Sequence, residues 1–160
     1  MLLSVTGVPG TGKTVVSQAL ARRLGFVYVS DSDIIDQFSL RESYDTFMHT
    51  YDISVSSFVA AVLTFCHGKD VVLDSHLSHY APADFVVVCQ CPLSLLRERL
   101  LHRGYSSVKI EENMECLRMQ ICYGETVERD LPHMVIDTSC SVDVNVYSII
   151  ETLKSFQAGV

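Results

Sequence analysis

The stretch LLSVTGVPGTGKTVVSQALARRLG occupies residues 2–25 and joins a short apolar run, a glycine-rich turn and a helical pattern. Within it, residues 7–14 read GVPGTGKT and match the pattern G-x-x-x-x-G-K-[ST]. The apolar run before this pattern predicts a strand and the segment after it predicts a helix, which is the context of a phosphate-binding loop. We therefore expect a protein that binds the phosphates of a nucleoside triphosphate.

The residue types in this loop suit that chemistry. Gly7 allows a tight turn after the strand, while Gly10 and Gly12 keep side chains away so that backbone N–H groups can face phosphate oxygens. The start of the following helix adds its dipole to the same place. Lys13 is expected to reach the β- and γ-phosphates and Thr14 to place its hydroxyl on Mg²⁺. The predicted nucleotide-binding residues here are Gly10, Thr11, Gly12, Lys13, Thr14 and Val15.

The form of the loop also bears on which triphosphate is bound. GVPGTGKT resembles the loops of nucleoside monophosphate kinases more than those of GTPases, and the sequence has no N-K-x-D guanine motif. ATP with Mg²⁺ is therefore the expected ligand.

Composition narrows the class of protein further. The chain has 160 residues, and this length predicts one domain that spans residues 1–160. Its net charge of −7 argues against a broad surface for binding nucleic acid. No apolar run approaches the roughly 18 residues of a membrane helix, and no signal peptide is recognised, so an intracellular protein is expected. The acidic surface would suit a basic protein partner.

The six cysteines form no C-x-x-C pattern, and several lie in apolar segments, so buried thiols are expected rather than disulfides or a zinc site. His76 and His79 form a conceivable metal pair, but no third ligand clusters with them in the sequence.

Strands and helices are predicted to alternate along the chain. Short apolar strands are expected over residues 2–6, 26–29, 70–73, 85–89 and 134–136, and helices over residues 13–24, 54–66, 92–102, 110–129 and 142–156. Residues 30–53 are polar and are expected to be irregular. Five apolar strands separated by helices predict a three-layer α/β fold with a parallel sheet.

Further chemistry is expected beyond the loop. Asp74 follows the third apolar strand, where a second acid would hold Mg²⁺ through water, and His76 next to it could orient a water or an acceptor. Arg99 and Arg103 are four residues apart and share a helix face, from which arginines can stabilise the charge of a transferring phosphoryl group. Gly104 is a plausible hinge. The predicted catalytic residues are Lys13, Asp74, His76 and Arg103.

Taken together, these motifs resemble the family of adenylate kinase isoenzyme 6, also known as coilin-interacting nuclear ATPase. The matching features run almost end to end: residues 7–14 and 25–33, Tyr44-Asp45, Tyr51-Asp52, Asp74-x-His76, Arg99-Leu100, Arg103-Gly104-Tyr105, Lys109, Asn113, Cys116, Gln120 and Tyr123. The D-x-H element together with R-G-Y-x-x-x-K is the specific part of this match.

The resemblance implies a five-stranded parallel sheet of order 2-3-1-4-5, a monophosphate-binding segment near residues 30–53 and a short lid near residues 102–112. It implies a broad-specificity nucleoside monophosphate kinase with ATPase activity, with Arg99 against the adenine. It also implies a role in maturation of the small ribosomal subunit through a basic ribosomal protein. A monomer in the cytoplasm, and in the nucleus of a eukaryote, is expected.

The acceptor segment departs from the family pattern. The family places an arginine shortly after the aspartate that matches Asp33, whereas Asp36 stands near that position here. Arg41 is the segment's one arginine and could replace it, so Asp33 and Arg41 are the predicted substrate-binding residues.

Two alternatives remain open at this point. One is an ATP-driven assembly factor whose kinase activity is incidental. The other is a different small-molecule kinase such as shikimate kinase, because Asp31-Ser32-Asp33 is similar to the D-x-D of that enzyme. The sequence lacks the Gly-Gly-Gly and F-R-x-x-E patterns expected of a shikimate kinase.

Overall fold

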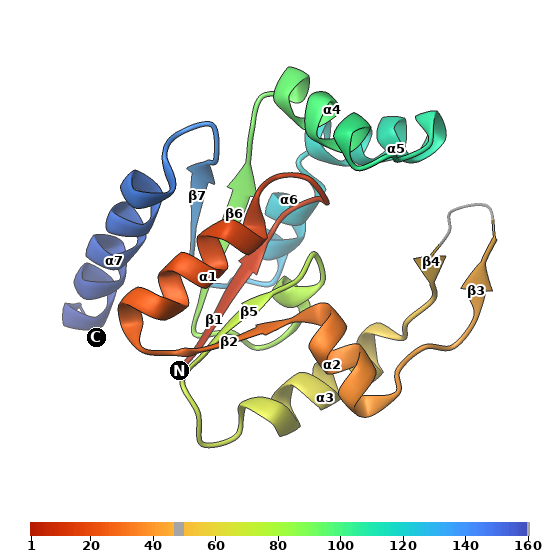
Figure 1. Cartoon of the computed structure of the whole chain (residues 1–160). Helices are drawn as coiled ribbons and strands as arrows, with labels where there is room; N and C mark the ends of the chain where they lie inside the picture. Colours follow the sequence, from red (N-terminus) through yellow and green to blue (C-terminus); the bar gives the residue numbers. More distant parts are fainter. Residues whose placement is uncertain (47–49, 160) are drawn as a thin grey trace.

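A five-stranded parallel sheet forms the centre of the computed structural model, which describes residues 1–46 and 50–159 (Figure 1). Its strands are β1 (Leu2–Thr6), β2 (Val27–Ser30), β5 (Val71–Asp74), β6 (Phe85–Gln90) and β7 (His133–Asp137). They lie in the order β2-β5-β1-β6-β7, and every neighbouring pair is parallel. Numbered along the chain as strands of this sheet, the order is 2-3-1-4-5, which confirms the predicted fold.

Helices cover both faces of the sheet (Figure 1). They are α1 (Lys13–Leu24), α2 (Asp31–Phe38), α3 (Val55–Cys66), the short 3-10 helix η1 (Ser78–Tyr80), α4 (Leu93–His102), α5 (Ser107–Arg118), α6 (Ile121–Glu128) and α7 (Val142–Ala158). Helices α1 and α7 pack on one face, while α2, α3 and α6 pack on the other. The three layers of the prediction are therefore present.

The two apolar layers follow from the alternation of side chains along a strand. Leu3 and Val5 of β1 face α1 and α7, whereas Leu2 points to the opposite layer with Phe58 of α3. A third apolar cluster joins Val8 of the phosphate loop to α4 and α5. The predicted phosphate loop is thus packed, through Val8, against this apolar cluster.

Residues 30–53 contain more regular secondary structure than the sequence predicted. They contain α2 and the two antiparallel strands β3 (Tyr44–Asp45) and β4 (Thr50–Tyr51), so the expectation of an irregular segment was wrong. Helix α2 forms because the Ser30 hydroxyl accepts from the Asp33 N–H at 3.2 Å and the Asp33 carboxylate accepts from the Ser30 N–H at 2.9 Å. This reciprocal capping box begins the helix, and burial of Ile34 holds it on the sheet. Residues 47–49 of the predicted acceptor segment lie outside the described residues.

The prediction of a single helix over residues 110–129 was also wrong. The chain forms two helices there, because Gln120 adopts a left-handed backbone with φ of 53° between α5 and α6. Helix α5 begins at Ser107, so the predicted lid over residues 102–112 consists of the end of α4, a turn at Gly104 and the first half of α5. Among the described residues, none of the helices is both long and apolar enough to cross a bilayer.

Candidate active site

The phosphate loop connects β1 to α1 at the carboxyl end of the sheet, and its glycines are required by close packing. A Cβ atom on Gly7 would lie 2.5 Å from the carbonyl oxygen of Cys89, and one on Gly10 would lie 2.9 Å from methyl groups of Leu96 and Leu100. Both glycines also have positive φ angles, 141° and 90°. A side chain at either position would collide with β6 or α4, so only glycine fits there.

Hydrogen bonds inside the loop fix its shape. The Thr11 hydroxyl donates to the carbonyl oxygen of Val8 at 2.8 Å, and the Lys13 ammonium donates to the same oxygen at 3.2 Å. Thr11 is fully buried, so its side chain contributes to the loop's conformation rather than to a cavity wall. Burial lowers the pKa of Lys13 below its ordinary value of 10.5, although the nearby Asp74 carboxylate opposes this shift. Lys13 is positioned as a cation whose hydration has been partly removed.

Asp74 lies at the end of β5, beside the start of α1. It is nearly buried, with 5% of its surface exposed, and it accepts a hydrogen bond of 3.0 Å from the Tyr28 hydroxyl. Thr14 lies in the first turn of α1 with an exposed side chain. A hydroxyl and a carboxylate are oxygen donors of the kind that Mg²⁺ prefers, so the two predicted metal residues fit that ion. No cluster of three or more metal-binding side chains occurs in the described part of the chain.

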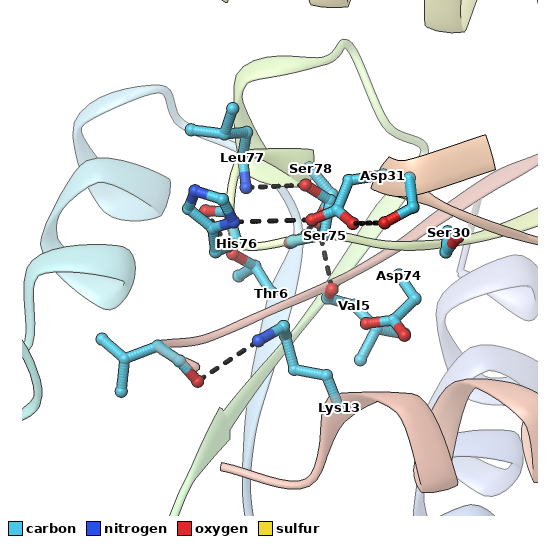
Figure 2. A network of polar contacts seen from close by, with 12 residues as sticks. Val5, Thr6, Lys13, Ser30, Asp31, Asp74, Ser75, His76, Leu77 and Ser78 are labelled. Atoms are coloured by element: carbon cyan, nitrogen blue, oxygen red, sulfur yellow. Dashed lines mark hydrogen bonds and ion pairs between the residues drawn. The ribbon is translucent and has the colours of Figure 1, made fainter. Parts of the chain in front are cut away.

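The two histidines that follow Asp74 have different surroundings. His76 is half exposed and its Nδ1 lies 3.5 Å from Asp31 Oδ2 (Figure 2), and it lines the larger cavity together with Lys13 and Asp74. Burial alone would raise the pKa of Asp31, but the contact with His76 and its charge outweigh burial and lower that pKa. The ring nitrogens of His79 instead contact Thr6 and Glu125, so the two histidines have different partners.

His79 is buried between the sheet and α6. Its Nε2 lies 2.8 Å from Glu125 and its Nδ1 lies 2.7 Å from the hydroxyl of Thr6, the last residue before the phosphate loop. A carboxylate can only accept, so Nε2 carries the proton and Nδ1 accepts from Thr6. The Tyr80 hydroxyl donates to the other Glu125 oxygen at 2.7 Å, and this bond raises the pKa of Tyr80 to about 12. Through His79, these hydrogen bonds connect Glu125 of α6 to Thr6, directly before the phosphate loop.

Two cavities lie beside the phosphate loop. The first has a volume of about 490 Å³ and is lined by Gly10, Gly12, Val15, Val16, Glu98, Arg99, His102, Arg103, Thr138, Cys140, Val142 and Asn145. The second, of about 990 Å³, is lined by Lys13, Thr14, Asp74 and His76 together with Asp31 and Arg41 and residues of α5 and α6. Arg103 lines both cavities, so the two spaces meet at this arginine. The smaller space is the candidate cavity for a nucleotide base and the larger one the candidate for an acceptor.

The arginines of α4 differ in how firmly they are held. Arg99 donates to the carbonyl oxygen of Gly10 at 3.3 Å and to that of Thr138 at 3.2 Å, which joins the phosphate loop to the β7–α7 connection. Arg103 caps the end of α4, is exposed, and makes no ion pair among the described residues. Arg97 is exposed and lines neither cavity. The structure thus separates a fixed arginine, Arg99, from one that can turn toward phosphate, Arg103.

The predicted substrate-binding pair is only partly brought to the second cavity. Arg41 lines it, with its guanidinium 2.6 Å from Asp36 and 5.2 Å from the centre of the Tyr51 ring. The carboxylate of Asp33 instead caps α2 and does not line the cavity. Asp31, two residues earlier, is the acid of the D-S-D triplet that lines the space, together with Ser32.

Sequence reasoning missed several residues of the site. Tyr28, Tyr80, Glu125 and Thr138 carried no motif, because each reaches the site through a contact between distant parts of the chain. Asp31 was noticed only as part of a possible D-x-D pattern. The S-x-x-D spacing from Ser30 to Asp33 was the available signal for the capping role of Asp33.

The parallel sheet, the glycine loop and the paired cavities define a P-loop protein of the kinase fold. Among solved structures, a shikimate kinase from Acinetobacter baumannii aligns with a TM-score of 0.68 at 18% identity, over 96% of this chain and 93% of that one. A deoxyadenosine kinase from M. mycoides aligns with a TM-score of 0.66 at 17% identity, over 97% of this chain and 100% of that one. At these identities the comparisons bear on the fold alone.

Sequence relatives identify the family. A family model described as an AAA domain matches residues 4–120. A protein of Thermococcus onnurineus named "Putative adenylate kinase" is 36% identical over 156 residues, covering 97% of this chain and 85% of the relative. An adenylate kinase isoenzyme 6 homolog of Caenorhabditis elegans is 34% identical over 162 residues, covering 96% and 89%. The chain belongs to this family of small adenylate-kinase-like proteins.

Proposed function

We propose that the chain transfers the γ-phosphoryl group of ATP to a nucleoside monophosphate, and that it hydrolyses ATP when no acceptor is bound. The observation that carries this proposal is the pair of cavities on the two sides of the phosphate loop, which meet at Arg103. A donor in the smaller cavity and an acceptor in the larger one would bring their phosphates together beside Lys13. The family relationship supports the same activity.

Each side chain has a defined task in this reaction. The transfer breaks the bond between the γ-phosphorus and the bridging oxygen of ADP and forms a bond to an acceptor phosphate oxygen. Lys13 and Arg103 neutralise charge that spreads over the phosphoryl oxygens, which is the main form of catalysis in this chemistry. Arg99 fixes the wall of the base cavity through Gly10 and Thr138. Bound Mg²⁺, which Thr14 and Asp74 would hold, supplies further neutralisation of phosphate charge.

Hydrolysis needs fewer of these groups than transfer does. Water can enter the larger cavity without a phosphate clamp, whereas a monophosphate must be oriented in line with the bond that breaks. Arg41 is the one arginine in the sequence of residues 30–53, and it lines this cavity, so it is available for that purpose. His76 borders the same space and is proposed to orient the attacking water or the acceptor.

A product assay tests this proposal. The protein is incubated with ATP and Mg²⁺ plus AMP, CMP, GMP, UMP, shikimate or no acceptor, and products are separated by chromatography. We expect diphosphates from one or more monophosphates, slower release of phosphate without acceptor, and no shikimate phosphate. Asp74→Asn should weaken the dependence on Mg²⁺, because an amide cannot replace the lost charge. Shikimate phosphate as the sole product, or no turnover with any acceptor, would refute the kinase proposal.

The structure weighs against the shikimate alternative on one point. The shikimate interpretation assigns both carboxylates of the D-x-D pattern to the hydroxylated acid. Here Asp31 lines the cavity, while Asp33 is hydrogen-bonded to the backbone and hydroxyl of Ser30. A nucleotide acceptor is therefore the better fit.

A role in ribosome assembly is a second proposed function, with a basic small-subunit ribosomal protein as partner and the cytoplasm, or the nucleus in a eukaryote, as its place. The net charge of −7 and the six acids among residues 30–53 favour a basic partner. Affinity capture with the purified protein, in the presence and absence of ATP, tests this role. Failure to retain any basic ribosomal protein at low salt would remove it.

A further inference from the structure

Arg41 and Asp36 form an ion pair at the rim of the larger cavity. Arg41 is the one arginine of residues 30–53, and this segment has no lysine. Its guanidinium lies 2.6 Å from the Asp36 carboxylate, next to the end of α2. Ile35 and Arg41 line the cavity, whereas Asp36 lies outside it. The positive charge that would attract an acceptor phosphate is thus already paired with a carboxylate from the rim.

This pair is weak enough to be exchanged. The side chains of Arg41 and Asp36 are 48% and 58% exposed, and ion pairs of such exposure contribute little to stability. A phosphate dianion offers a guanidinium two parallel charge-assisted hydrogen bonds, which a single carboxylate contact cannot match. Asp36 therefore competes with a phosphate for Arg41 but does not exclude it.

The position of Asp36 adds a second unfavourable effect on the acceptor. It lies in the last turn of α2, where the helix carbonyls carry a partial negative charge, and a carboxylate there is stabilised mainly by its cationic neighbour. When Arg41 turns toward a phosphate, Asp36 is left without that neighbour. Binding of the acceptor thus leaves an unpaired negative charge behind.

We propose that Asp36 is a specificity-determining residue which, by pairing with Arg41, weakens the binding of nucleoside monophosphates and so favours hydrolysis of ATP over transfer. This inference rests on the proposed function for its consequence in catalysis, while the competition itself is a property of binding. It predicts that the ratio of transfer to hydrolysis is set outside the catalytic centre. Asp36 would not weaken the binding of an acceptor that has no phosphate group, because such an acceptor does not compete for Arg41.

The test uses Asp36→Asn in the full chain, which keeps the shape of the side chain and removes its charge. We expect the KM for AMP to fall by about three- to tenfold, while kcat for transfer and the rate of acceptor-free hydrolysis change less than about twofold. Isothermal titration of AMP without ATP should give a matching decrease in Kd. Addition of Arg41→Ala to Asp36→Asn should abolish the gain.

Glu42→Gln is the matched control. It removes an equal charge one residue after Arg41, and Glu42 makes no side-chain hydrogen bond or ion pair among the described residues. A smaller change in KM than that of Asp36→Asn supports local competition, whereas an equal change means that only the net charge matters and overturns the inference. An unchanged or raised AMP Kd in Asp36→Asn also overturns it.

The two proposals fail in different ways. If the wild-type chain transfers phosphate to AMP but Asp36→Asn leaves KM unchanged, the inference is wrong and the kinase function stands. If no acceptor is phosphorylated but Asp36→Asn tightens AMP binding, the kinase function is wrong and the competition stands.

Discussion

The two cavities beside the phosphate loop are bounded by different kinds of structure. The smaller one is closed by the loop, α4 and the β7–α7 connection, which Arg99 and Thr138 join through hydrogen bonds to backbone carbonyls. The larger one is bounded on its acceptor side by α2 and the β3–β4 hairpin, where Arg41 meets Asp36 and Tyr51 at the surface. Substitutions on the first side should disturb fold and catalysis together, whereas those on the second side should tune acceptor binding alone.

The largest effect is expected at Lys13, which lines the larger cavity beside the phosphate loop. Lys13→Ala should abolish turnover, because no other cation of the phosphate loop can neutralise the β- and γ-phosphates. Steady-state assays of transfer and hydrolysis measure this, with circular dichroism to verify folding and Lys154→Ala, on the exposed face of α7, as control. Near-normal Mg²⁺-dependent turnover in folded Lys13→Ala would remove the phosphate-loop assignment.

The arginines of α4 should separate catalysis from nucleotide binding. Arg103→Ala should lower kcat/KM by about 10²-fold, since an arginine that stabilises transferring phosphate is lost. Arg99→Ala should mainly raise the KM for ATP, because it loosens the wall of the base cavity. Arg97→Ala is the control and should behave like the wild type. A reversal of the two effects would mean that the lid is assigned one helical turn out of place.

Substitution of Arg41 should weaken transfer to the acceptor without affecting hydrolysis. Arg41→Ala should reduce kcat/KM for transfer to AMP by about tenfold or more, the usual cost of a lost charge-assisted hydrogen bond. Acceptor-free hydrolysis should be unchanged, as it should be in the surface control Arg22→Ala. Because a single arginine serves this wall, the wild-type KM for AMP should lie in the upper part of the range of about 1 μM to 1 mM, or above it. An AMP KM of a few micromolar would show that other groups hold the phosphate.

The smallest effect concerns the dependence of stability on pH at the His79–Glu125 contact, beside the larger cavity. Burial lowers the pKa of His79 below its ordinary value of 6.5, against the opposing influence of Glu125. The unfolded chain therefore binds more protons than the folded one below about pH 6.5, and stability is lost as pH falls through that range. The loss cannot exceed about 1.4 kcal/mol per pH unit, which corresponds to a few degrees in Tm.

Thermal unfolding between pH 5 and pH 8 measures this effect. His79→Gln should have a lower Tm at pH 8 and a flatter dependence on pH than the wild type, whereas the exposed His102→Gln should keep the wild-type slope. Parallel curves for wild type and His79→Gln would mean that His79 does not titrate across folding in this range.

The donor side could be predicted from sequence because its signals are local. The glycines, Lys13 and Thr14 lie within eight consecutive residues, and their spacing alone places them on a strand, a turn and a helix. Apolar strands separated by helices also predicted a parallel α/β sheet, whereas the order of its strands came from the family resemblance. Asp74 was recognisable as the polar end of an apolar strand.

The acceptor side was harder to predict for two physical reasons. Helix α2 is short and polar, and only the capping box at Ser30 and the buried Ile34 distinguish it from a loop. The break between α5 and α6 occurs at Gln120, a residue that rarely adopts φ of 53°, so no glycine or proline announces it. The Tyr28–Asp74 and His79–Glu125 contacts each join residues 46 positions apart, beyond the reach of any local pattern.

Cys140 is a site at which a probe could be attached beside the smaller cavity. All six cysteines lie within the described residues, and Cys140 alone is exposed, whereas burial raises the pKa of the other five thiols. It also lines the wall of the smaller cavity, between Thr138 and Val142. A thiol-reactive fluorophore at neutral pH should therefore attach at Cys140 faster than at the half-buried Cys66, Cys116 and Cys122. The labelled chain would carry an optical reporter at the rim of the cavity, through which nucleotide arrival and departure could be followed in real time.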